Sequence, residues 1–418
     1  MVDYLIGRSL EKEINETKRK VLLVISLVFN LGILGVFKYL NFFIESWIDA
    51  GETLGFQMHT ETLSIILPVG ISFYTFQTLS YTLDIYYNRL TPTRNFINFA
   101  AFVSFFPQLV AGPIERAANL LPQFKNKRIF NSKKAINGLQ LIIWGLFQKM
   151  VIADSSATYV NAIFENYQDR NTLTLMLGAI YFAFQIYGDF AGYSNIAIGT
   201  ARLFGFNLMR NFNYPYFSKN IAEFWRRWHI SLSTWFRDYL YIPLGGSRGK
   251  ILLQIRNIFI IFLVSGIWHG ANWTFIAWGA LHACLFIPLL FLKSDKKSSN
   301  RSKNKIFSIS SFIKVFLTFS LVSIGWVFFR SSSIRDSIAY LLKLFTNLKF
   351  KIEYLSIERY SVEMLLLICA FVTIEFMHRN KEHPLHGKFS YLKTLSVLIM
   401  IFIFGVYSEH SDFIYFQF

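Results

Sequence analysis

The chain has 418 residues, of which 53% are hydrophobic and 18% aromatic, and its mean hydropathy is +0.38. These values exclude a soluble domain of this length and indicate an all-α, multi-pass membrane protein. The formal net charge of +17 indicates positive loops on the inner side of a membrane rather than nucleic-acid binding, because no basic-aromatic motif accompanies it. We expect one membrane-embedded domain over residues 1–418, with lipid contacts and no nucleic-acid partner.

The membrane-embedded elements can be predicted from the apolar stretches. A charged segment over residues 1–20 precedes the first stretch and lacks the pattern of a short cleavable signal. Long stretches near the roughly 20 residues that cross a bilayer cover residues 21–43, 63–87, 173–187, 258–267, 273–292, 312–329, 361–377 and 391–407. Shorter or interrupted stretches, 96–110 and 136–152, favour tilted, broken or re-entrant helices. We predict roughly nine to eleven membrane elements.

Residues 220–241 form an amphipathic pattern. At 3.6 residues per turn, one stripe is aromatic and apolar and the opposite stripe is polar; the first contains Trp225, Trp228, Leu232, Trp235 and Tyr239, and the second Arg226, Arg227, Thr234, Arg237 and Asp238. The pattern predicts an interfacial or cavity-lining helix, which Asn220 and Glu223 begin as a capping box and Pro243 ends. At the edge of the aromatic face, His229 either points into a central cavity or bonds a backbone carbonyl.

The arginines of this segment allow two interpretations. Arg226 and Arg227 can hold the phosphates of a cytosolic donor, because a guanidinium binds phosphate in bidentate geometry. They can equally anchor the helix to anionic lipid headgroups, at about 1 kcal/mol per basic residue. Both interpretations stay open on the sequence.

A turn with the sequence Trp268-His269-Gly270-Ala271 lies between the apolar stretches 258–267 and 273–292. The sequence therefore predicts a titratable imidazole in surroundings lined by hydrocarbon. A charge at the middle of a membrane helix costs about +2.5 to +3.5 kcal/mol on insertion scales, and an ionisable residue there is a functional candidate by default. A neutral histidine avoids much of this cost and can act as a general base.

Loop charges predict the orientation. Residues 293–305 carry six Lys and Arg against one Asp, so this loop is expected in the cytoplasm. Counting spans from it puts His269 toward the extracytoplasmic half and the tail, 408–418, on the same side. The tail contains Glu409 and Asp412 and no Lys or Arg.

Other candidate ligands are interpreted as structural. Cys284 and Cys369 lie in predicted spans, which argues against a disulfide framework or a zinc site. His282 is expected to pack in the core. We expect solvent exposure and no metal at the three histidines of a basic loop, His378, His383 and His386.

Several blocks carry a family resemblance. Residues 223–233 (Glu-Phe-Trp-Arg-Arg-Trp-His-Ile-Ser-Leu-Ser) resemble the membrane-bound O-acyltransferase family, specifically its bacterial alginate and peptidoglycan O-acetyltransferase branch. Supporting blocks are residues 68–77, 106–114, 238–241, 245–246 and 268–272. The likeness runs in the family's order from about Asp3 to Phe418.

The resemblance implies a ring of membrane helices around a thinned central core, where a cytosolic tunnel for the acyl donor meets an outer funnel. Irregular helices at 136–152 and 189–204 suit that picture. The resemblance also implies that His269 is catalytic and that His229 is a second functional position in the core. Asp189 matches an acidic position of the family; a chemical role, a bond to Arg202 and a helix cap are alternatives.

The final residues, 413–418, resemble the terminal motif of the acetyltransferase branch, whose tyrosine, here Tyr415, is proposed to relay the acyl group. The teichoic acid D-alanylation member lacks this tail and uses a separate small protein. Members of the family begin with additional apolar helices, so either the native start of this chain lies upstream or its donor-side wall is incomplete.

The implied activity is acetyl transfer from cytosolic acetyl-CoA, as co-substrate and without a metal, across a bacterial cytoplasmic membrane. His269 would deprotonate Tyr415, and a secreted or periplasmic serine esterase-like (SGNH-type) partner would pass the acetyl group to a polysaccharide such as peptidoglycan or alginate. Expected substrate contacts, including candidate oxyanion donors, are Trp225, Arg226, Arg227, Trp268, Asn272 and Trp273. The alternatives are direct transfer to a glycan or lipid hydroxyl and a non-enzymatic transporter or scaffold.

Overall fold

A computed structural model describes residues 1–57, 62–63, 67–292, 308–346, 348–351, 353, 355, 363–407 and 413–414 of the chain. Every regular element in these residues is a helix. Within the described part of the chain, six helices are long and apolar enough to cross a membrane, and three shorter ones are apolar. The predicted all-α membrane architecture is confirmed, whereas the basic loop 293–305 lies outside the described residues.

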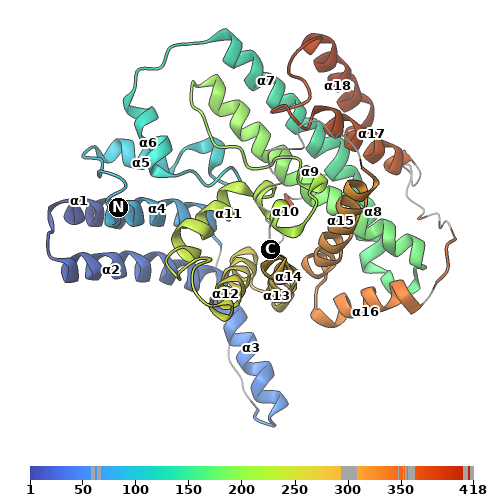
Figure 1. Ribbon diagram of the computed structural model, residues 1–418, viewed down its shortest axis with the longest axis horizontal. Helices are drawn as coiled ribbons and strands as arrows, with labels where there is room; N and C mark the ends of the chain where they lie inside the picture. The colour runs from blue at the N-terminus through green and yellow to red at the C-terminus, as the bar shows by residue number, and fades with distance from the viewer. Residues whose placement is uncertain are drawn as a thin grey trace.

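In chain order the helices are α1 (Val2–Lys12), α2 (Glu16–Leu34), η1 (Gly35–Tyr39), α3 (Leu40–Thr53), α4 (Ile71–Tyr86), α5 (Phe96–Val103), η2 (Phe106–Gln108), α6 (Ala117–Lys125), α7 (Ser132–Leu146), η3 (Phe147–Ala153), α8 (Asp154–Glu165), η4 (Tyr167–Asp169), α9 (Thr172–Leu203), η5 (Pro215–Phe217), α10 (Ile221–Arg227), α11 (Ile230–Phe236), η6 (Arg237–Tyr241), α12 (Ile251–His269), α13 (Trp273–Phe286), α14 (Pro288–Phe291), α15 (Ile309–Arg330), α16 (Ile334–Thr346), α17 (Glu363–His378) and α18 (Ser390–Phe404). Helices α1, α2 and α4 to α6 lie on the left of the molecule in Figure 1 and α16 to α18 on the right, with α9 to α14 between them.

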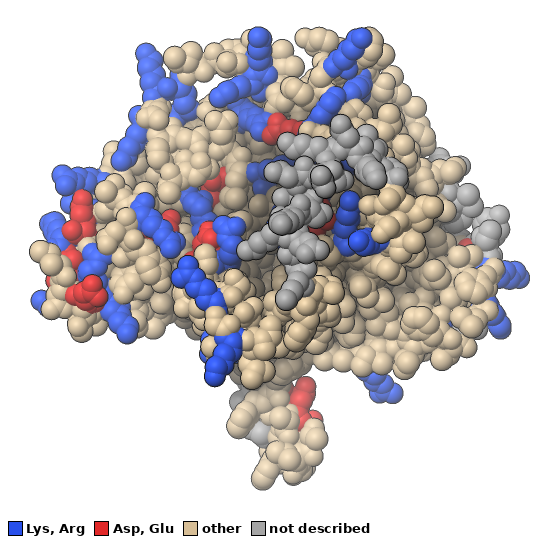
Figure 2. Space-filling model, viewed as in Figure 1, with Lys and Arg blue, Asp and Glu red and all other residues tan. Residues whose placement is uncertain are grey.

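The first span is longer than predicted. α2, η1 and α3 form one continuous helix, Glu16–Thr53, of 38 residues, which is about 57 Å at 1.5 Å per residue. A bilayer core is about 30 Å thick, and α3 projects from the body of the molecule (Figure 1). α3 contains three acidic residues and no Lys or Arg, and its projecting end is free of blue atoms in Figure 2.

α9 is the central helix of the fold. Its 32 residues are buried over most of their length, against α7, α8, η3 and α15. The predicted irregularity at 189–204 is wrong, because a helix that is buried within the protein satisfies its backbone polar groups best by remaining unbroken. The predicted irregularity at 136–152 is present as the π-helix η3, which follows α7 without a gap.

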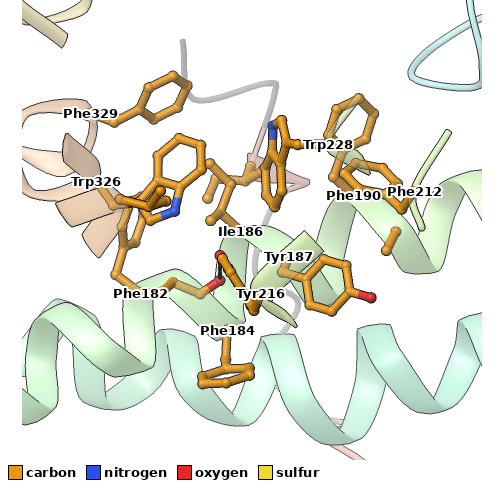
Figure 3. Packing of buried hydrophobic residues seen from close by; sticks show 14 of the residues in the cluster. Phe182, Phe184, Ile186, Tyr187, Phe190, Phe212, Tyr216, Trp228, Trp326 and Phe329 are labelled. Atoms are coloured by element: carbon orange, nitrogen blue, oxygen red, sulfur yellow. Dashed lines mark hydrogen bonds between the residues drawn. The ribbon is translucent and has the colours of Figure 1, made fainter. Parts of the chain in front are cut away.

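Aromatic side chains fill the core beside α9. Phe182 and Phe190 of α9 lie opposite Phe212, Trp228 and Trp326 (Figure 3), all of them nearly inaccessible to solvent. The Trp228 ring lies 5.0 Å from Phe212 and 5.0 Å from Trp326. This packing joins α9 and α15 to the segment that contains His229.

The amphipathic segment 220–241 is not one helix. Its predicted start is confirmed, since Asn220 Oδ1 accepts a hydrogen bond from Glu223 N at 2.8 Å. α10 ends at Arg227 and α11 begins at Ile230, however, and the intervening His229 has φ 41°. Backbone bonds to residues 211 and 213 replace the missing helical bonds on both sides of the break.

The turn between α17 and α18 folds over the ends of α7 and α9. His383 is buried and lies 2.9 Å from Asn137 Nδ2, so its predicted solvent exposure is wrong. Burial lowers the pKa of His383 to about 4, and the ring is neutral at pH 7. Glu382 pairs with Arg202 of α9, which holds the turn in place.

The hairpin of α12 and α13 is closely packed at two glycines. A Cβ atom at Gly266 would lie 2.3 Å from the Phe275 carbonyl oxygen, and one at Gly279 would lie 2.3 Å from the Phe262 carbonyl oxygen. Backbone atoms of a packed helix pair cannot move aside locally. Because glycine has no side chain, Gly266 and Gly279 let the two helices approach each other closely.

We expect the Gly266→Ala variant to lose about 1–3 kcal/mol of stability, the usual cost of overpacking. Thermal unfolding of the purified protein in detergent measures this loss. Gly32→Ala in α2 is the matched control, because a Cβ atom there meets nothing within 4 Å. A Gly266→Ala variant with the same unfolding temperature as the wild type would contradict the close packing.

Candidate active site

His269 is the last residue of α12 and lies in an aromatic enclosure. Its side chain is buried, with ring centroids of Trp268 and Trp278 at 5.1 Å and Phe329 at 5.3 Å. The second predicted histidine, His229, is near it, with 6.5 Å between the ring centroids. The structure thus brings the two histidines together from separate elements.

His229 is oriented by Asn211. The His229 Nδ1 atom lies 3.1 Å from Asn211 Oδ1, which also accepts from the Ser231 hydroxyl at 2.9 Å. If Nδ1 carries the proton, Nε2 is an acceptor. Nε2 is buried and has no hydrogen-bond partner among the described residues. Sequence analysis did not identify Asn211, because the contact joins residues 18 positions apart without a periodic pattern.

The segment with Asn211 is held by a buried carboxyl group. Glu115 accepts hydrogen bonds from the backbone N–H of Met209 and from Asn119 Nδ2. Burial raises the pKa of Glu115 to about 7. Glu115 therefore connects the loop before α6 to the segment before η5, which contains the Asn211 that orients His229.

The carbonyl end of α12 is bound by η1. Lys38 Nζ donates to the carbonyl oxygens of Trp268 at 3.1 Å and of His269 at 3.0 Å. The Tyr39 hydroxyl donates to the Ile267 carbonyl at 2.8 Å. Sequence analysis missed Lys38, which lies inside the first apolar stretch; a lysine within a span was the signal that could have found it.

A pocket of about 200 Å³ opens beside His269. Its walls are the end of α12, η1 and the turn before α4, and they include Lys38, Pro68, Phe73, Trp268 and His269. The block at residues 68–77, which carries part of the family resemblance, thus forms a wall of the same site as the block at 268–272.

A larger cavity, of about 440 Å³, lies between α10, α11, α12 and α13. Trp225, Arg226 and Arg237 line it, together with apolar residues. Arg227 does not line it, because its guanidinium pairs with Glu223 at 2.6 Å. The predicted donor-side residues are therefore divided between the cavity and the surface of α10, and Arg237 joins the cavity.

The two hollows lie along different parts of α12. Ile258, Ile261 and Ser265 line the larger cavity, and His269 lines the smaller pocket. At 1.5 Å per residue, these cavity positions lie roughly 6–16 Å before His269 along the helix. The smaller pocket lies at the helix end, so the two hollows occupy different levels of α12.

Two other residues that were predicted to contact the substrate, Asn272 and Trp273, form hydrogen bonds within the protein. Asn272 caps α13, with its Oδ1 accepting from Thr274 N at 2.9 Å, and its Nδ2 donates to the Ser332 carbonyl. Trp273 donates its indole N–H to Ser46 Oγ of α3. Neither residue lines the 200 Å³ pocket.

The described part of the C-terminal tail lies against the middle of α9. Ile414 is buried, and its N–H donates to Asp189 at 2.6 Å, while Lys149 pairs with the same carboxylate at 2.8 Å. Phe413 packs 6.5 Å from Phe190, whose ring contacts His229 at 4.6 Å. Of the alternatives for Asp189, the bond to Arg202 and the helix cap are wrong. Tyr415 lies outside the described residues.

No group of three or more His, Cys, Asp or Glu side chains that could hold a metal occurs in the part of the chain that the structure describes. The side chains gathered here are two imidazoles, an ammonium group and aromatic rings. Such a set suits proton transfer and charge stabilisation around a carbonyl group.

The model of the membrane-bound O-acyltransferase family matches residues 88–329, which is more than half of the chain. The chain belongs to this family. The matched range contains both histidines, Asn211 and the larger cavity, whereas η1 with Lys38 and the wall at 68–77 precede it.

This family member is similar to two kinds of O-acetylating protein. It is 43% identical over 313 residues to the probable alginate O-acetylase of Pseudomonas aeruginosa, covering 75% of this chain and 58% of the relative. It is 32% identical to the peptidoglycan O-acetyltransferase of Helicobacter pylori, covering 100% of this chain and 86% of the relative. The chain therefore spans under two thirds of the length of the Pseudomonas relative.

A more distant relative transfers a different group by name. The teichoic acid D-alanyltransferase of Bacillus subtilis is 28% identical over 284 residues, covering 65% of this chain and 71% of the relative.

We expect Asn211→Ala to impair the site because it leaves the buried His229 N–H without an acceptor, at a cost of about 1–3 kcal/mol. Expressed in rate, this is roughly a tenfold to hundredfold loss of acyl transfer. Ser194→Ala is the matched control, since it removes only the hydroxyl that Asn211 Nδ2 donates to. Equal rates for the two variants, measured with labelled acyl donor, would contradict the orienting role.

Proposed function

We propose that this chain is a membrane O-acetyltransferase that moves an acetyl group from cytosolic acetyl-CoA to an extracytoplasmic partner, which acetylates a cell-wall or secreted polysaccharide. The observation that carries the proposal is the pair of hollows at different levels of α12, with His269 at the helix end. The names of the alginate and peptidoglycan relatives, an O-acetylase and an O-acetyltransferase, support the acetyl group and the polysaccharide.

The distribution of charge supports the proposed orientation. η1, which follows α2, meets the end of α12 at Lys38 and His269, so we infer that α2 and α12, which lead to this contact, begin on one side of the membrane. That side has Lys18, Arg19 and Lys20 near the start of α2 and a basic start of α12, whereas the opposite side has the acidic α3. The positive-inside rule assigns the basic side to the cytoplasm.

The larger cavity suits the donor. Acetyl-CoA combines charged phosphates with a long neutral arm, and the cavity combines Arg226 and Arg237 with apolar walls. Arginine at the cytoplasmic mouth would hold phosphate, and the arm would extend along α12 toward Ser265. The acetyl thioester would then lie one helical turn from His269.

The proposed chemistry is acyl transfer with His269 as general base. A hydroxyl oxygen attacks the thioester carbonyl carbon while His269 takes the hydroxyl proton; the C–S bond then breaks, and the CoA thiolate receives that proton. Positioned base catalysis contributes about 10²–10⁴ in rate. His229, with its unpartnered Nε2, is the second functional histidine and would accept a hydrogen bond from the reacting group.

We assign the attacking hydroxyl to Tyr415. The support is the docking of Ile414, the preceding residue, at Asp189, and of Phe413 beside the Phe190 ring that contacts His229. The acetyl-tyrosine would pass its group to a secreted or periplasmic SGNH-type serine esterase-like protein. The membrane is proposed to be the bacterial cytoplasmic membrane, with the C-terminus on its outer side.

Isotopically labelled acetyl-CoA tests the relay. We expect the purified chain to acquire labelled acetyl on the peptide containing Tyr415, and the His269→Ala variant to acquire none because it lacks the base. Mass spectrometry of the digested protein measures both. His386→Ala is the control, since His386 is exposed and belongs to the turn between α17 and α18.

Two outcomes would redirect the proposal. CoA release in the presence of polysaccharide and full activity of Tyr415→Phe would mean direct transfer to a glycan or lipid hydroxyl. No CoA release under any of these conditions would contradict acetyl transfer and favour another donor or a transporter or scaffold.

The donor cavity has its own test. We expect Arg226→Met to raise the half-saturating concentration of acetyl-CoA about tenfold, the equivalent of one charge-assisted hydrogen bond, with little change in the maximal rate. Arg227→Met is the matched control, because the neighbouring guanidinium pairs with Glu223 and does not line the cavity. The difference should shrink at high salt. Equal half-saturation in both variants would argue against this cavity as the donor site.

A further inference from the structure

Lys38 is a charged residue in the middle of a membrane-spanning helix. It belongs to the π-helix η1, within the continuous helix Glu16–Thr53. Single π-helical turns inside α-helices often occur at functional sites. Ionisable residues inside membrane spans are costly and are functional candidates by default. Two independent features therefore single out the same short element.

The ammonium group of Lys38 is held at the residue that carries the imidazole. It donates to the carbonyl oxygens of Trp268 and His269, at 3.1 and 3.0 Å. Carbonyl groups at the end of a helix lack helical partners, and a cation is stabilised there by the helix dipole. These bonds fix the position of Lys38 relative to His269, and both are made to backbone oxygens rather than to the imidazole ring.

One donor of Lys38 remains for a substrate. An ammonium group has three N–H donors, and the backbone of α12 accepts two. The Lys38 ammonium group has no third hydrogen-bond acceptor among the described residues. Lys38 also lines the 200 Å³ pocket together with His269. The pocket therefore contains a base and a cationic donor side by side.

Two of the three other donors considered for this role, Asn272 and Trp273, are used elsewhere, and the third, the Trp268 indole N–H, carries no charge. Asn272 Nδ2 donates to the Ser332 carbonyl at 3.1 Å, and the Trp273 indole donates to Ser46 Oγ at 3.1 Å. Acyl transfer develops negative charge on the carbonyl oxygen, and a fixed donor aimed at that oxygen lowers the barrier. Of the residues that line the pocket, Lys38 carries the positive charge.

We propose that Lys38 is a catalytic residue that donates its remaining N–H to the carbonyl oxygen of the acyl thioester, an inference that rests on the proposed acetyl transfer. As the hydroxyl oxygen bonds to the carbonyl carbon, the C=O electron pair moves to the oxygen facing Lys38, and the proton goes to His269. When the C=O bond re-forms, the C–S bond breaks and the thiolate takes the proton from His269. Lys38 keeps its charge throughout.

Three variants separate catalysis from helix capping. Release of CoA from acetyl-CoA is measured in a single turnover with the purified full chain in detergent, because the proposed relay releases one CoA per chain without the partner protein. We expect Lys38→Met to lower the maximal rate about 10²–10³-fold, as loss of one oxyanion donor does, with the half-saturating acetyl-CoA concentration within about twofold. Lys38→Arg should recover tenfold or more of this loss. Tyr39→Phe, which removes only the Ile267 contact, should stay within about threefold of the wild type.

A chemical variant keeps the test valid if Lys38→Met does not fold. Lys38→Cys is prepared with Cys284→Ala and Cys369→Ala, because both native thiols are exposed. One folded batch is then divided between 2-bromoethylamine, which restores an ammonium group, and iodoacetamide, which does not. We expect at least a tenfold higher rate after aminoethylation.

The contrary outcomes are distinct. Equal rates after the two alkylations, full activity of Lys38→Met, or an equal loss in Tyr39→Phe would overturn the role of Lys38 and leave the proposed function intact. No CoA release by the wild type would overturn the proposed function and this inference with it.

Discussion

A helix that ends inside a membrane exposes carbonyl groups that no water can reach, and the way α12 ends determines where this site forms. Its last turn is capped by Lys38 and Tyr39 from the middle of the first long helix. The requirement for backbone partners thus draws a cation to the residue that carries the imidazole. The same capping interaction closes one wall of the pocket beside His269.

The second histidine is held by a related constraint. His229 lies in a left-handed conformation between α10 and α11, which is uncommon for a residue with a side chain. The broken helix is tolerated because the extended residues 211–213 supply the missing backbone bonds, and the Asn211 side chain then orients the ring. Strain of this kind persists only where the surroundings hold it in place. Glu115 also holds this segment, because its carboxyl group accepts a hydrogen bond from the Met209 N–H.

These two constraints produce a site that is open along one helix. The larger cavity lies beside the earlier turns of α12 and the smaller pocket lies at its end. In the proposed function, this arrangement would receive the donor and the acceptor from the two sides of the membrane, whereas a soluble enzyme binds both substrates from one solution. The docking of Phe413 and Ile414 against α9 connects the end of the chain to the same core through Phe190.

The sequence by itself determined the all-helical membrane class and the family, and it singled out the two histidines as candidates, because hydropathy and contiguous motifs are local properties of the chain. It also located the start of α10, since a capping box depends on residues three positions apart. It did not determine the break at His229, the orienting Asn211, the capping Lys38 or the pairing of Asp189 with Lys149. Each of these joins residues that are distant in sequence, and a buried polar group takes whichever partner the folded helices bring within reach. Tertiary structure alone decided those partners, because in a membrane core the need for a hydrogen bond is general while its geometry belongs to the packing.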